Sequence, residues 1–546
     1  MLTPTPLEEL LDLAADVIGC DRRVLPAGAA GSPFITLGGG LGQAVRLQAR
    51  AERQLGLAVD LAQLLGPAPL ADVLARARPA PVRAPGPAAG GGGVRALLPG
   101  QSAALAAERV AGAGVVARIV SAELSGPLDA GALRRALAAL GARHEGLRTA
   151  FATTPRGPVR RVLAVCPPPL VTLEPVAAGP GEDLVAAAHA RLAVRAGRLV
   201  GRPGLPPLAF ALTPLAAGSQ LLSFVHHDAV ADSRSAALLW QELLADYDRA
   251  VRRRPLDHTP RPGPDAPHRT RPAALPGPAR VLPADRAGQL RSLAGGLDLA
   301  PAARPAAVFD FRGERLLFGL GTRLRDAADA TARRAGVPHG TVLLAAWALA
   351  VGRRAGRERL LVGTEVPRRP TAELLRTVVP CSATVPVACE LEGGVDYFLR
   401  GIACAFSEAL QYADVDDADT ARAAGVPVDR FRAALTQVTF AARDELLPES
   451  LRAGGLSARF HHGHPGAVTA DAALTVLRWH EHPLLSLEFA SARLTRAQAA
   501  QLARALRAAL TALVTSPPHT PVEDLPDPPA ARDEVPSGRP LAVPLP

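Results

Sequence analysis

The sequence predicts an α+β protein in two parts, a small helical bundle followed by a larger region of mixed helices and strands. Three observations lead to this expectation. Apolar residues recur at helical spacing up to about residue 78. A proline- and glycine-rich stretch at residues 79–95 then has the composition of a linker. From Leu97 onward, short apolar runs alternate with amphipathic segments, in a chain of 546 residues that can bury more than one core.

The composition argues against nucleic acid as a partner. The formal net charge is +10, but every basic residue is Arg, Lys and Asn are absent, and the arginines are scattered. Such a pattern indicates compositional bias of a genome rather than a basic binding face. Aromatic residues make up only 3% of the chain, so platforms for base stacking are scarce. The absence of Lys also excludes a phosphate-loop lysine and a Schiff-base lysine.

The cysteines and the apolar runs predict a cytoplasmic protein with no membrane partner. The five cysteines are odd in number and lack the spacing of metal ligands, which favours reduced, buried thiols. The first residues, MLTPTPLEELL, are acidic and lead into an amphipathic helix, unlike a secretory signal. The longest apolar run, residues 341–352, is too short to cross a bilayer and predicts a buried helix.

Residues 1–78 are expected to form the helical bundle, with helices near residues 7–17, 41–55 and 69–76. The segment that starts Phe34-Ile-Thr-Leu-Gly-Gly resembles the motif of peptidyl-carrier domains. The resemblance places the serine that accepts phosphopantetheine at Leu41 and the preceding aspartate at Gly40. Because leucine has no nucleophilic oxygen, no phosphopantetheine and no other cofactor is expected here. A docking module without a cofactor is the preferred interpretation.

Residues 96–265 begin with a strand, an N-cap at Asp129 and an amphipathic helix. The next nine residues, RHEGLRTAF at 143–151, resemble a motif of the condensation domains of nonribosomal peptide synthetases. That family has the chloramphenicol-acetyltransferase-like fold, so the resemblance implies two lobes that flank a tunnel. It also implies a structural role for this motif, with Arg148 as a candidate ion-pair partner.

The stretch SFVHHDAVADSRS at residues 223–235 carries the candidate active site. An apolar run ends in His226, His227 and Asp228, and a helix is expected to begin at Ser233. The stretch resembles the family's active-site motif His-His-x-x-x-Asp-Gly, whose second histidine is catalytic and lies four residues before the aspartate. If Asp232 matches that aspartate, the catalytic position holds Asp228, His227 takes the place of the structural histidine, and His226 belongs to the strand.

A second register remains open, in which a one-residue bulge restores the histidine pair as His226-His227 and makes His227 the base. In the preferred register, neighbouring side chains at a strand end point to opposite sides. Asp228 is then expected to face the tunnel and His227 the N-terminal lobe. An aspartate, with an ordinary pKa of about 3.9, is a poorer base than an imidazole near 6.5. The resemblance implies that Asp232 forms a buried ion pair with an arginine.

The remaining sequence predicts a proline-rich connector at residues 266–304, a C-terminal lobe at residues 305–522 and a disordered tail at residues 523–546. The segment RLLVGTEVPRR at 359–369 resembles the family's strand followed by Gly-Thr-Pro-x-x-x-Arg, and residues 377–387 and 428–440 stand where two further family motifs occur. Thr495 and Gln498 form a capping-box pattern. The histidines at 461, 462, 464, 480 and 482 lack a completing carboxylate or cysteine at ligand spacing, so surface or loop positions and no metal are expected.

Together these resemblances imply a nonribosomal peptide synthetase component with a carrier-like domain and a condensation-like domain. Since Leu41 and Asp228 replace both chemical residues, the first hypothesis is a degenerate condensation domain that acts as a docking or scaffold partner. The alternative is an active enzyme that uses His227 as base to form an amide between carrier-bound substrates. In either case the expected partners are other synthetase proteins and their carrier domains.

Overall fold

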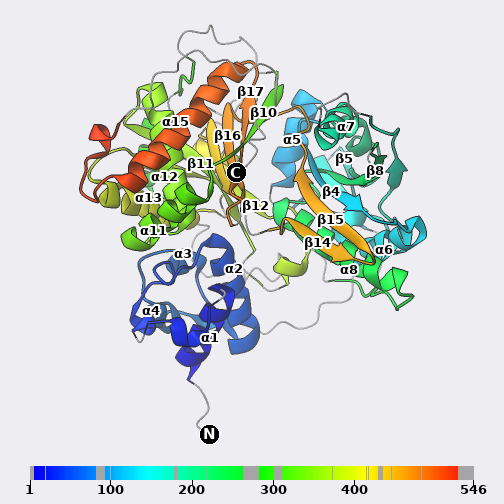
Figure 1. The fold of residues 1–546 in the computed structure, drawn as a ribbon, viewed down its shortest axis with the longest axis horizontal. Coiled ribbons are helices and arrows are strands. Elements are labelled where there is room, and N and C mark those ends of the chain that lie inside the picture. The colour runs from blue at the N-terminus through cyan, green and yellow to red at the C-terminus, as the bar shows by residue number, and fades with distance from the viewer. Residues whose placement is uncertain are drawn as a thin grey trace.

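The computed structural model shows an N-terminal helical unit and two lobes, each lobe built on a six-stranded sheet (Figure 1). It describes residues 5–526 apart from 81–92, 262–281, 301–309, 428–434 and short gaps at 19, 27, 99, 113, 156, 178–182, 217, 295, 370, 372, 414, 416, 444–445 and 481. Most of the predicted linker, most of the predicted tail and half of the motif at 428–440 lie outside the described residues.

Residues 5–79 form the N-terminal helical unit. Its core is apolar and includes Leu10, Phe34 and Leu47, none of which is exposed. A Cβ atom at Gly39 would overlap the Phe34 ring, so the chain needs glycine at this close approach. The elements are α1 (Pro6–Ile18), α2 (Leu41–Arg50) with a π-helical turn (Ala51–Leu55), β1 (Leu57–Ala58), α3 (Leu61–Leu64), α4 (Leu70–Ala75) and β2 (Arg78–Pro79).

The N-terminal lobe has a sheet with the strand order β14-β15-β4-β9-β8-β7. Helices α6 and α8 pack on one face of this sheet and α7 on the other. The sheet and its helices comprise β4 (Ala117–Ser125), α6 (Ala130–Arg143), β7 (Leu170–Thr172), α7 (Leu184–Val200), β8 (Leu208–Pro214), β9 (Gln220–His227) and α8 (Ser233–Val251). Beside them lie α5 (Gln101–Ala111) and a small sheet of β3 (Val94–Arg95), β5 (Thr149–Thr154) and β6 (Gly157–Val162).

The C-terminal lobe has a sheet with the strand order β10-β17-β16-β13-β11-β12, packed against α12, α13 and α15. Trp347 on α12 is fully buried, as expected for a helix that is apolar on all sides. The lobe comprises β10 (Gly313–Gly319), α11 (Thr322–Ala335), α12 (His339–Ala355), β11 (Arg359–Pro367), β12 (Ser382–Glu390), α13 (Val395–Leu410), α14 (Asp417–Ala423), β13 (Val438–Ala442), β16 (Ala472–Arg478), β17 (Leu484–Ala490) and α15 (Arg496–Thr515).

In the described part of the chain, no single helix is long and apolar enough to cross a membrane. The pair α11–α12 passes a test of length and composition when the two helices are taken together, but it bends by 104° at its break. Residues 342–352 of α12 are buried in the C-terminal lobe. The apolar run at 341–352 therefore forms a core helix of this lobe, which is the role that its length predicted.

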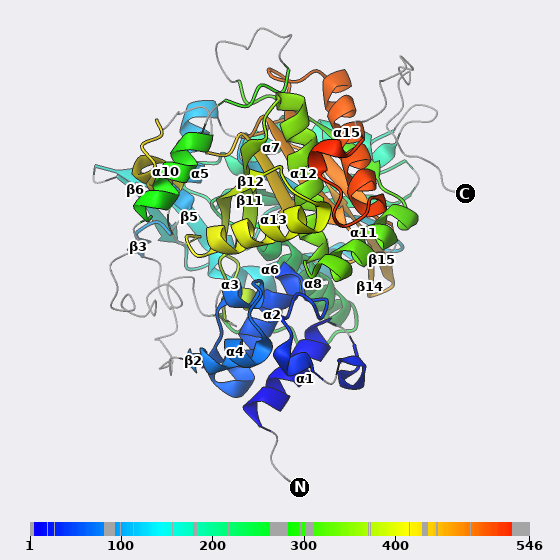
Figure 2. The same cartoon turned by 90° about the vertical axis from the view of Figure 1, so that its left-hand side faces the viewer.

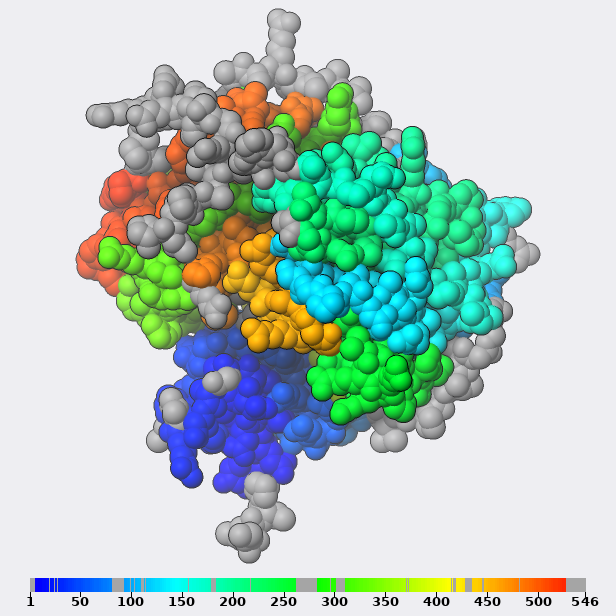
Figure 3. Space-filling view, turned by 45° about the vertical axis from the view of Figure 1, so that its right-hand side comes forward, coloured from blue at the N-terminus to red at the C-terminus, as the bar shows by residue number. Residues whose placement is uncertain are grey.

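One hairpin crosses from the second half of the chain into the N-terminal lobe. Strands β14 (Ser450–Ala453) and β15 (Leu456–His462) extend the N-terminal sheet, because β15 pairs antiparallel with β4 in the register His461 opposite Ser121. Figure 3 shows this orange segment against the cyan β4 region. The structure thus differs from the boundary 305–522. Pairing of β15 covers the β4 edge, whose backbone groups would otherwise lack partners.

A helix also lies inside the predicted connector. Helix α10 (Ala284–Leu293) buries Leu290 against Leu361 and Ala388 on strands β11 and β12. Pro283 stands just before its first residue, a position where the missing N–H of proline costs no hydrogen bond. The proline-rich composition around this helix concealed it in the sequence.

Candidate active site at the end of strand β9

The loop after β9 carries the candidate active site and is held in place at both ends. His226 and His227 are the last residues of β9, opposite Arg118 and Ala117 on β4. The backbone N–H of Asp228 still donates to the Val116 carbonyl, at 2.9 Å. On α5, the Gln101 side chain donates to the Ala229 carbonyl at 2.8 Å, so a helix from another part of the chain fixes the loop.

His227 is buried among protein groups and has no exposed surface. Its Nδ1 accepts a hydrogen bond from the Ala229 N–H at 2.9 Å, which assigns the remaining ring proton to Nε2. Nε2 lies 3.4 Å from a carboxylate oxygen of Glu108 on α5 and makes no hydrogen bond of normal geometry. The His227 ring holds the pKa of Glu108 below its ordinary value. Both ring nitrogens therefore face protein groups of the N-terminal lobe.

His226 points to the other side of β9. Its ring stacks on Phe224 with the two ring centres 4.7 Å apart, and only 2% of the residue is exposed. Burial lowers the pKa of His226 to about 4, although the Asp228 carboxylate opposes this shift. His226 is therefore a neutral residue of the lobe interior at pH 7.

Asp228 forms an ion pair with Arg118, with 2.8 Å between the carboxylate oxygen and Nη2. Both side chains are partly exposed, 31% for Asp228 and 35% for Arg118. The charge of Asp228 also reaches Arg443, which follows β13 in the C-terminal lobe. Burial alone would lower the pKa of Arg443, but Glu365, Glu488 and Asp228 together raise it. The Asp228 charge is thus felt by a residue of the C-terminal lobe as well as by Arg118.

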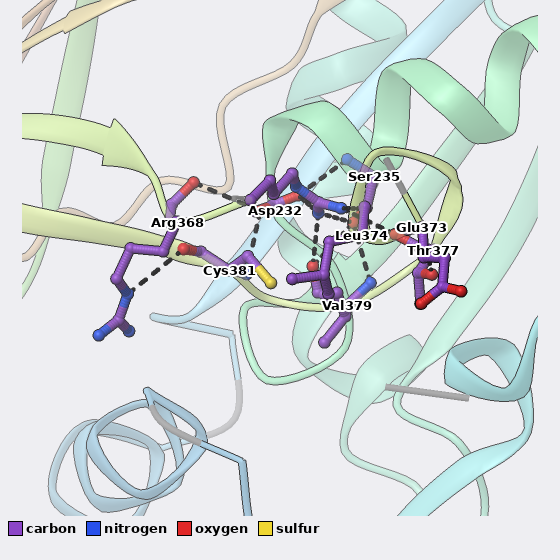
Figure 4. A network of polar contacts seen from close by, with 10 residues as sticks. Asp232, Ser235, Arg368, Glu373, Leu374, Thr377, Val379 and Cys381 are labelled. Carbon is purple, nitrogen blue, oxygen red and sulfur yellow. Dashed lines mark hydrogen bonds and ion pairs between the residues drawn. The ribbon is translucent and has the colours of Figure 1, made fainter. Parts of the chain in front are cut away.

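Asp232 occupies a different environment, at the centre of a buried polar network (Figure 4). One carboxylate oxygen caps α8 by accepting from the Ser235 N–H at 2.8 Å and pairs with Arg369 at 2.7 Å. The other oxygen accepts from the Cys381 N–H at 3.0 Å. Burial would raise the pKa of Asp232, but the Arg369 charge and the N–H donors outweigh it and hold the pKa below its ordinary value.

Arg369 and Ser235 complete this network. The Arg369 guanidinium is fully buried and also donates to the carbonyls of Leu374, Thr377 and Val379. The Ser235 hydroxyl donates to the Val379 carbonyl and accepts from its N–H. Since Asp232 and Ser235 belong to the N-terminal lobe and the other groups to the segment between β11 and β12, the network joins the two lobes.

The sequence motif at 143–151 is also a buried polar network, but Arg148 differs from its expected role. Arg148 donates to the main-chain carbonyls of Gly141, Leu163 and Ala164 instead of forming the expected ion pair with a carboxylate. The ion-pair partner of Asp232 is Arg369, the last residue of the segment that resembled Gly-Thr-Pro-x-x-x-Arg. Spacing in sequence cannot show which of two arginines reaches a carboxylate through the fold.

Other residues of the motif pair across the lobe. Arg143 contacts Glu242 and Asp246 on α8, at 2.7 and 2.5 Å, and Glu145 pairs with Arg95 and Arg160. The first two contacts link α6 to α8, and the second two link the turn after α6 to strands β3 and β6 of the small sheet.

Sequence reasoning missed Arg118, Glu108 and Gln101. Arg118 is one of many arginines, and it meets Asp228 only because β4 and β9 are neighbours. Glu108 and Gln101 lie on α5, which no motif marked. In each case the partner is more than 100 residues away in sequence, so no local pattern could have paired them.

Of the histidines expected at surface or loop positions, those at 461 and 462 lie on strand β15, whereas those at 464, 480 and 482 lie outside helices and strands. The His461 Nε2 is 3.4 Å from a Glu123 carboxylate oxygen, and burial lowers the pKa of His462 to about 3. Across the described residues, no group of three or more His, Cys, Asp or Glu side chains is arranged to hold a metal ion.

Leu41, the position matched to the phosphopantetheine serine, is the first residue of α2. Its partly buried side chain packs against the apolar core of the N-terminal helical unit. Gly40 before it donates its N–H to the Gln43 side chain at 2.9 Å. Leucine at this position therefore contributes to the core of the unit.

Comparison with known families and sequences identifies relatives of the larger part of the chain. Residues 286–524 match the family model described as the condensation domain. Chondramide synthase cmdD of Chondromyces crocatus is 29% identical over 305 residues, covering 54% of this chain and 8% of that protein. Phosphinothricin tripeptide synthetase PhsB of Streptomyces viridochromogenes is 30% identical over 290 residues, covering 49% of this chain and 22% of that protein. The chain thus spans a small fraction of these relatives.

Solved structures show the same fold. The X-domain from teicoplanin biosynthesis superposes with a TM-score of 0.65 at 22% identity, covering 79% of this chain and 97% of that one. The first condensation domain of the CDA synthetase gives a TM-score of 0.65 at 18% identity, covering 80% of this chain and 99% of that one. A complex of the X-domain and OxyB from teicoplanin biosynthesis also matches, with a TM-score of 0.62 at 23% identity and coverage of 79% and 96%.

Proposed function

We propose that this chain, which contains a condensation domain of the type found in nonribosomal peptide synthetases, acts as a docking component of such an assembly and has lost ordinary condensation activity. The observation that carries this proposal is the Asp228–Arg118 ion pair at 2.8 Å. In the register preferred from the sequence, Asp228 takes the position of the family's catalytic histidine. The carrier-like character of the N-terminal helical unit is part of the same proposal.

Condensation joins an amine to a thioester carbonyl, and a base near the attacking amine accelerates it by accepting a proton. One carboxylate oxygen of Asp228 is already paired with the Arg118 guanidinium, which leaves only the other oxygen to accept this proton. The Asp228 carboxylate would also attract the ammonium form of the amine, which has no free electron pair for attack. An ion pair here therefore opposes the reaction in two ways.

The alternative, an active enzyme with His227 as base, has weaker support. A base needs a free nitrogen that can reach the substrate. Nδ1 of His227 accepts from Ala229, Nε2 faces Glu108, and only 1% of the side chain is exposed. A rearranged loop would have to turn the ring around before it could act.

The docking role is proposed from the kind of protein that shares the fold. Condensation domains of nonribosomal peptide synthetases work with other modules and carriers, and the X-domain of teicoplanin biosynthesis occurs in a complex with OxyB. We propose synthetase proteins and their carrier domains as the partners of this chain. A docking role needs a folded surface and no free base, since binding depends on surface shape rather than on the chemistry of the loop.

An amide-formation assay tests the loss of activity. Wild type, Asp228→His, Asp228→Asn and His227→Ala would be incubated with a short aminoacyl thioester and an amine, and the product measured by mass spectrometry. We expect wild type and Asp228→Asn to match the rate in buffer. Asp228→His restores an imidazole next to Arg118, whose charge favours the neutral, basic form of the ring, so it alone is expected to gain activity. Amide formation by wild type that is lost in a folded His227→Ala variant would establish the alternative.

A second assay tests the absence of the phosphopantetheine arm. Wild type would be incubated with coenzyme A and a broad phosphopantetheinyl transferase, and its intact mass measured. No mass gain is expected, because Leu41 offers no hydroxyl. A gain of one arm within residues 1–78 would contradict the proposal.

A further inference from the structure

The N-terminal helical unit lies directly against the C-terminal lobe. In Figures 1 and 2 its helix α3 is next to α13, and contacts between these two helices confirm that they are neighbours. Phe406 and Leu410 on α13 pack against the apolar core of the C-terminal lobe and also against the apolar core of the helical unit. The two cores therefore meet through the same two side chains.

Two further contacts fix the orientation of the unit. The Ser407 hydroxyl on α13 donates to the Ala62 carbonyl on α3, at 3.1 Å. Some distance along the interface, a Cβ atom built on Gly336, which ends α11, would lie 3.2 Å from the Thr36 methyl group. Two separate points of contact restrict rotation of the unit about either one.

We infer that the contact between α3 and α13 is a permanent interface, which makes the N-terminal helical unit a fixed part of the C-terminal lobe. Separation would remove the contacts of Phe406 and Leu410 with the helical unit and expose more of both side chains to water. The unit is also tethered through residues 81–92, and a short tether gives an effective concentration of about 1 mM. An interface whose Kd lies well below that concentration stays closed in nearly all molecules.

A fixed position of the unit is consistent with Leu41 in place of the serine that would accept a phosphopantetheine arm. A carrier serves distant sites by moving, whereas a unit that stays on α13 adds rigid surface to the lobe. The role of this rigid surface in docking rests on the proposed function, but the interface itself does not depend on that function. The experiment that follows therefore measures shape and uses no activity.

A disulfide across the interface provides the test. A Cβ atom at Gly66 would lie 3.5 Å from the Ser407 hydroxyl oxygen, so a sulfur in place of that oxygen would be close enough for a cysteine at position 66 to reach it. Gly66→Cys and Ser407→Cys would be combined in the full chain with Cys404→Ser, since Cys404 is an exposed thiol on the same helix. Peptide mapping after mild oxidation would identify the 66–407 bond, and small-angle X-ray scattering would compare the locked and the wild-type chain.

The interface predicts that the disulfide forms in nearly all molecules and that the locked and wild-type chains have the same radius of gyration. Ser407→Arg places a charge between the two helices and is expected to increase that radius. Gly401→Arg is the matched control, because it adds the same side chain to α13 at a position with nothing within 4 Å. A wild type that is larger than the locked chain, a disulfide that fails to form, or a folded Ser407→Arg variant of unchanged size would each overturn the inference. Amide formation by wild type would contradict only the proposed function.

Discussion

Two arginine–aspartate pairs lie at the ends of one short loop and differ mainly in their surroundings. Asp228–Arg118 and Asp232–Arg369 have nearly equal lengths, 2.8 and 2.7 Å. The side chains of the first pair are 31% and 35% exposed, whereas those of the second are 5% and 0% exposed. Water screens the first pair and competes for its hydrogen bonds, while the second has only protein partners. The same two residue types therefore form a weak surface contact at Asp228 and a buried connection between the two lobes at Asp232.

The largest expected effect is that of Asp232→Ala. Removing Asp232 leaves the Arg369 charge buried without its partner, which should lower the free energy of unfolding by about 3–5 kcal/mol. The loss of the N-cap on α8 adds to this cost. Urea unfolding followed by circular dichroism would measure it, with Asp228→Ala as the matched control. Equal losses for the two variants would show that burial does not separate the pairs.

Acid should weaken the region around His226 before it reaches the Asp232 network. The pKa of His226 is about 4 in the folded protein and about 6.5 in the unfolded chain, so the unfolded state binds the extra proton between these values. The stability that depends on neutral His226 is complete above pH 6.5 and is lost as the pH falls toward 4. The Asp232 pKa is lowered, so its contribution persists until the pH falls below about 3.9 and through the folded pKa.

His226→Phe would isolate the contribution of His226 to the pH dependence of stability, since it keeps a ring next to Phe224 and removes the titrating group. Between pH 7.5 and pH 5 the variant should lose about 2 kcal/mol less stability than wild type. His258→Gln, which replaces a histidine at an exposed position, is the control. Parallel pH curves for His226→Phe and wild type would contradict the assignment.

A smaller loss is expected from Ser235→Ala. The hydroxyl serves both the N–H and the carbonyl of Val379, and Ser235 has no exposed surface. Deleting it leaves the Val379 N–H without its partner, while the Val379 carbonyl still accepts from Arg369, at a cost of about 1–3 kcal/mol in unfolding free energy. Ser382→Ala removes a longer contact, 3.4 Å, between the Ser382 hydroxyl and the Asp232 carboxylate. It should have little effect in the same urea experiment. A greater loss for Ser382→Ala would reverse the order of importance within the network.

The smallest expected effect is that of Asp228→Ala. A partly exposed ion pair contributes about 0.2–1 kcal/mol, and salt reduces this contribution. Unfolding in low and high NaCl, for wild type, Asp228→Ala, Arg118→Ala and the double variant, would give the coupling energy of the pair. A coupling well above 1 kcal/mol that persists in high salt would make this pair equivalent to the buried one.

The sequence alone determined the elements whose signals are local. Helical spacing predicted the helices near residues 7–17 and 41–55, and the apolar run at 341–352 predicted the buried helix α12. The capping box at Thr495 forms as predicted, because its hydrogen bonds join residues three positions apart. The condensation-type fold was predicted from short motifs, and the family match and the solved structures support it.

Only the tertiary structure decided which residues meet. Arg369 rather than Arg148 pairs with Asp232, Arg118 pairs with Asp228, and β15 joins the sheet of the other lobe. The chain contains many arginines, and their side chains are chemically identical. Their spacing in the sequence therefore does not show which one a distant carboxylate will contact. That choice depends on strand order and on the packing of the lobes. The same packing buries the Asp232–Arg369 pair and leaves the Asp228–Arg118 pair partly exposed.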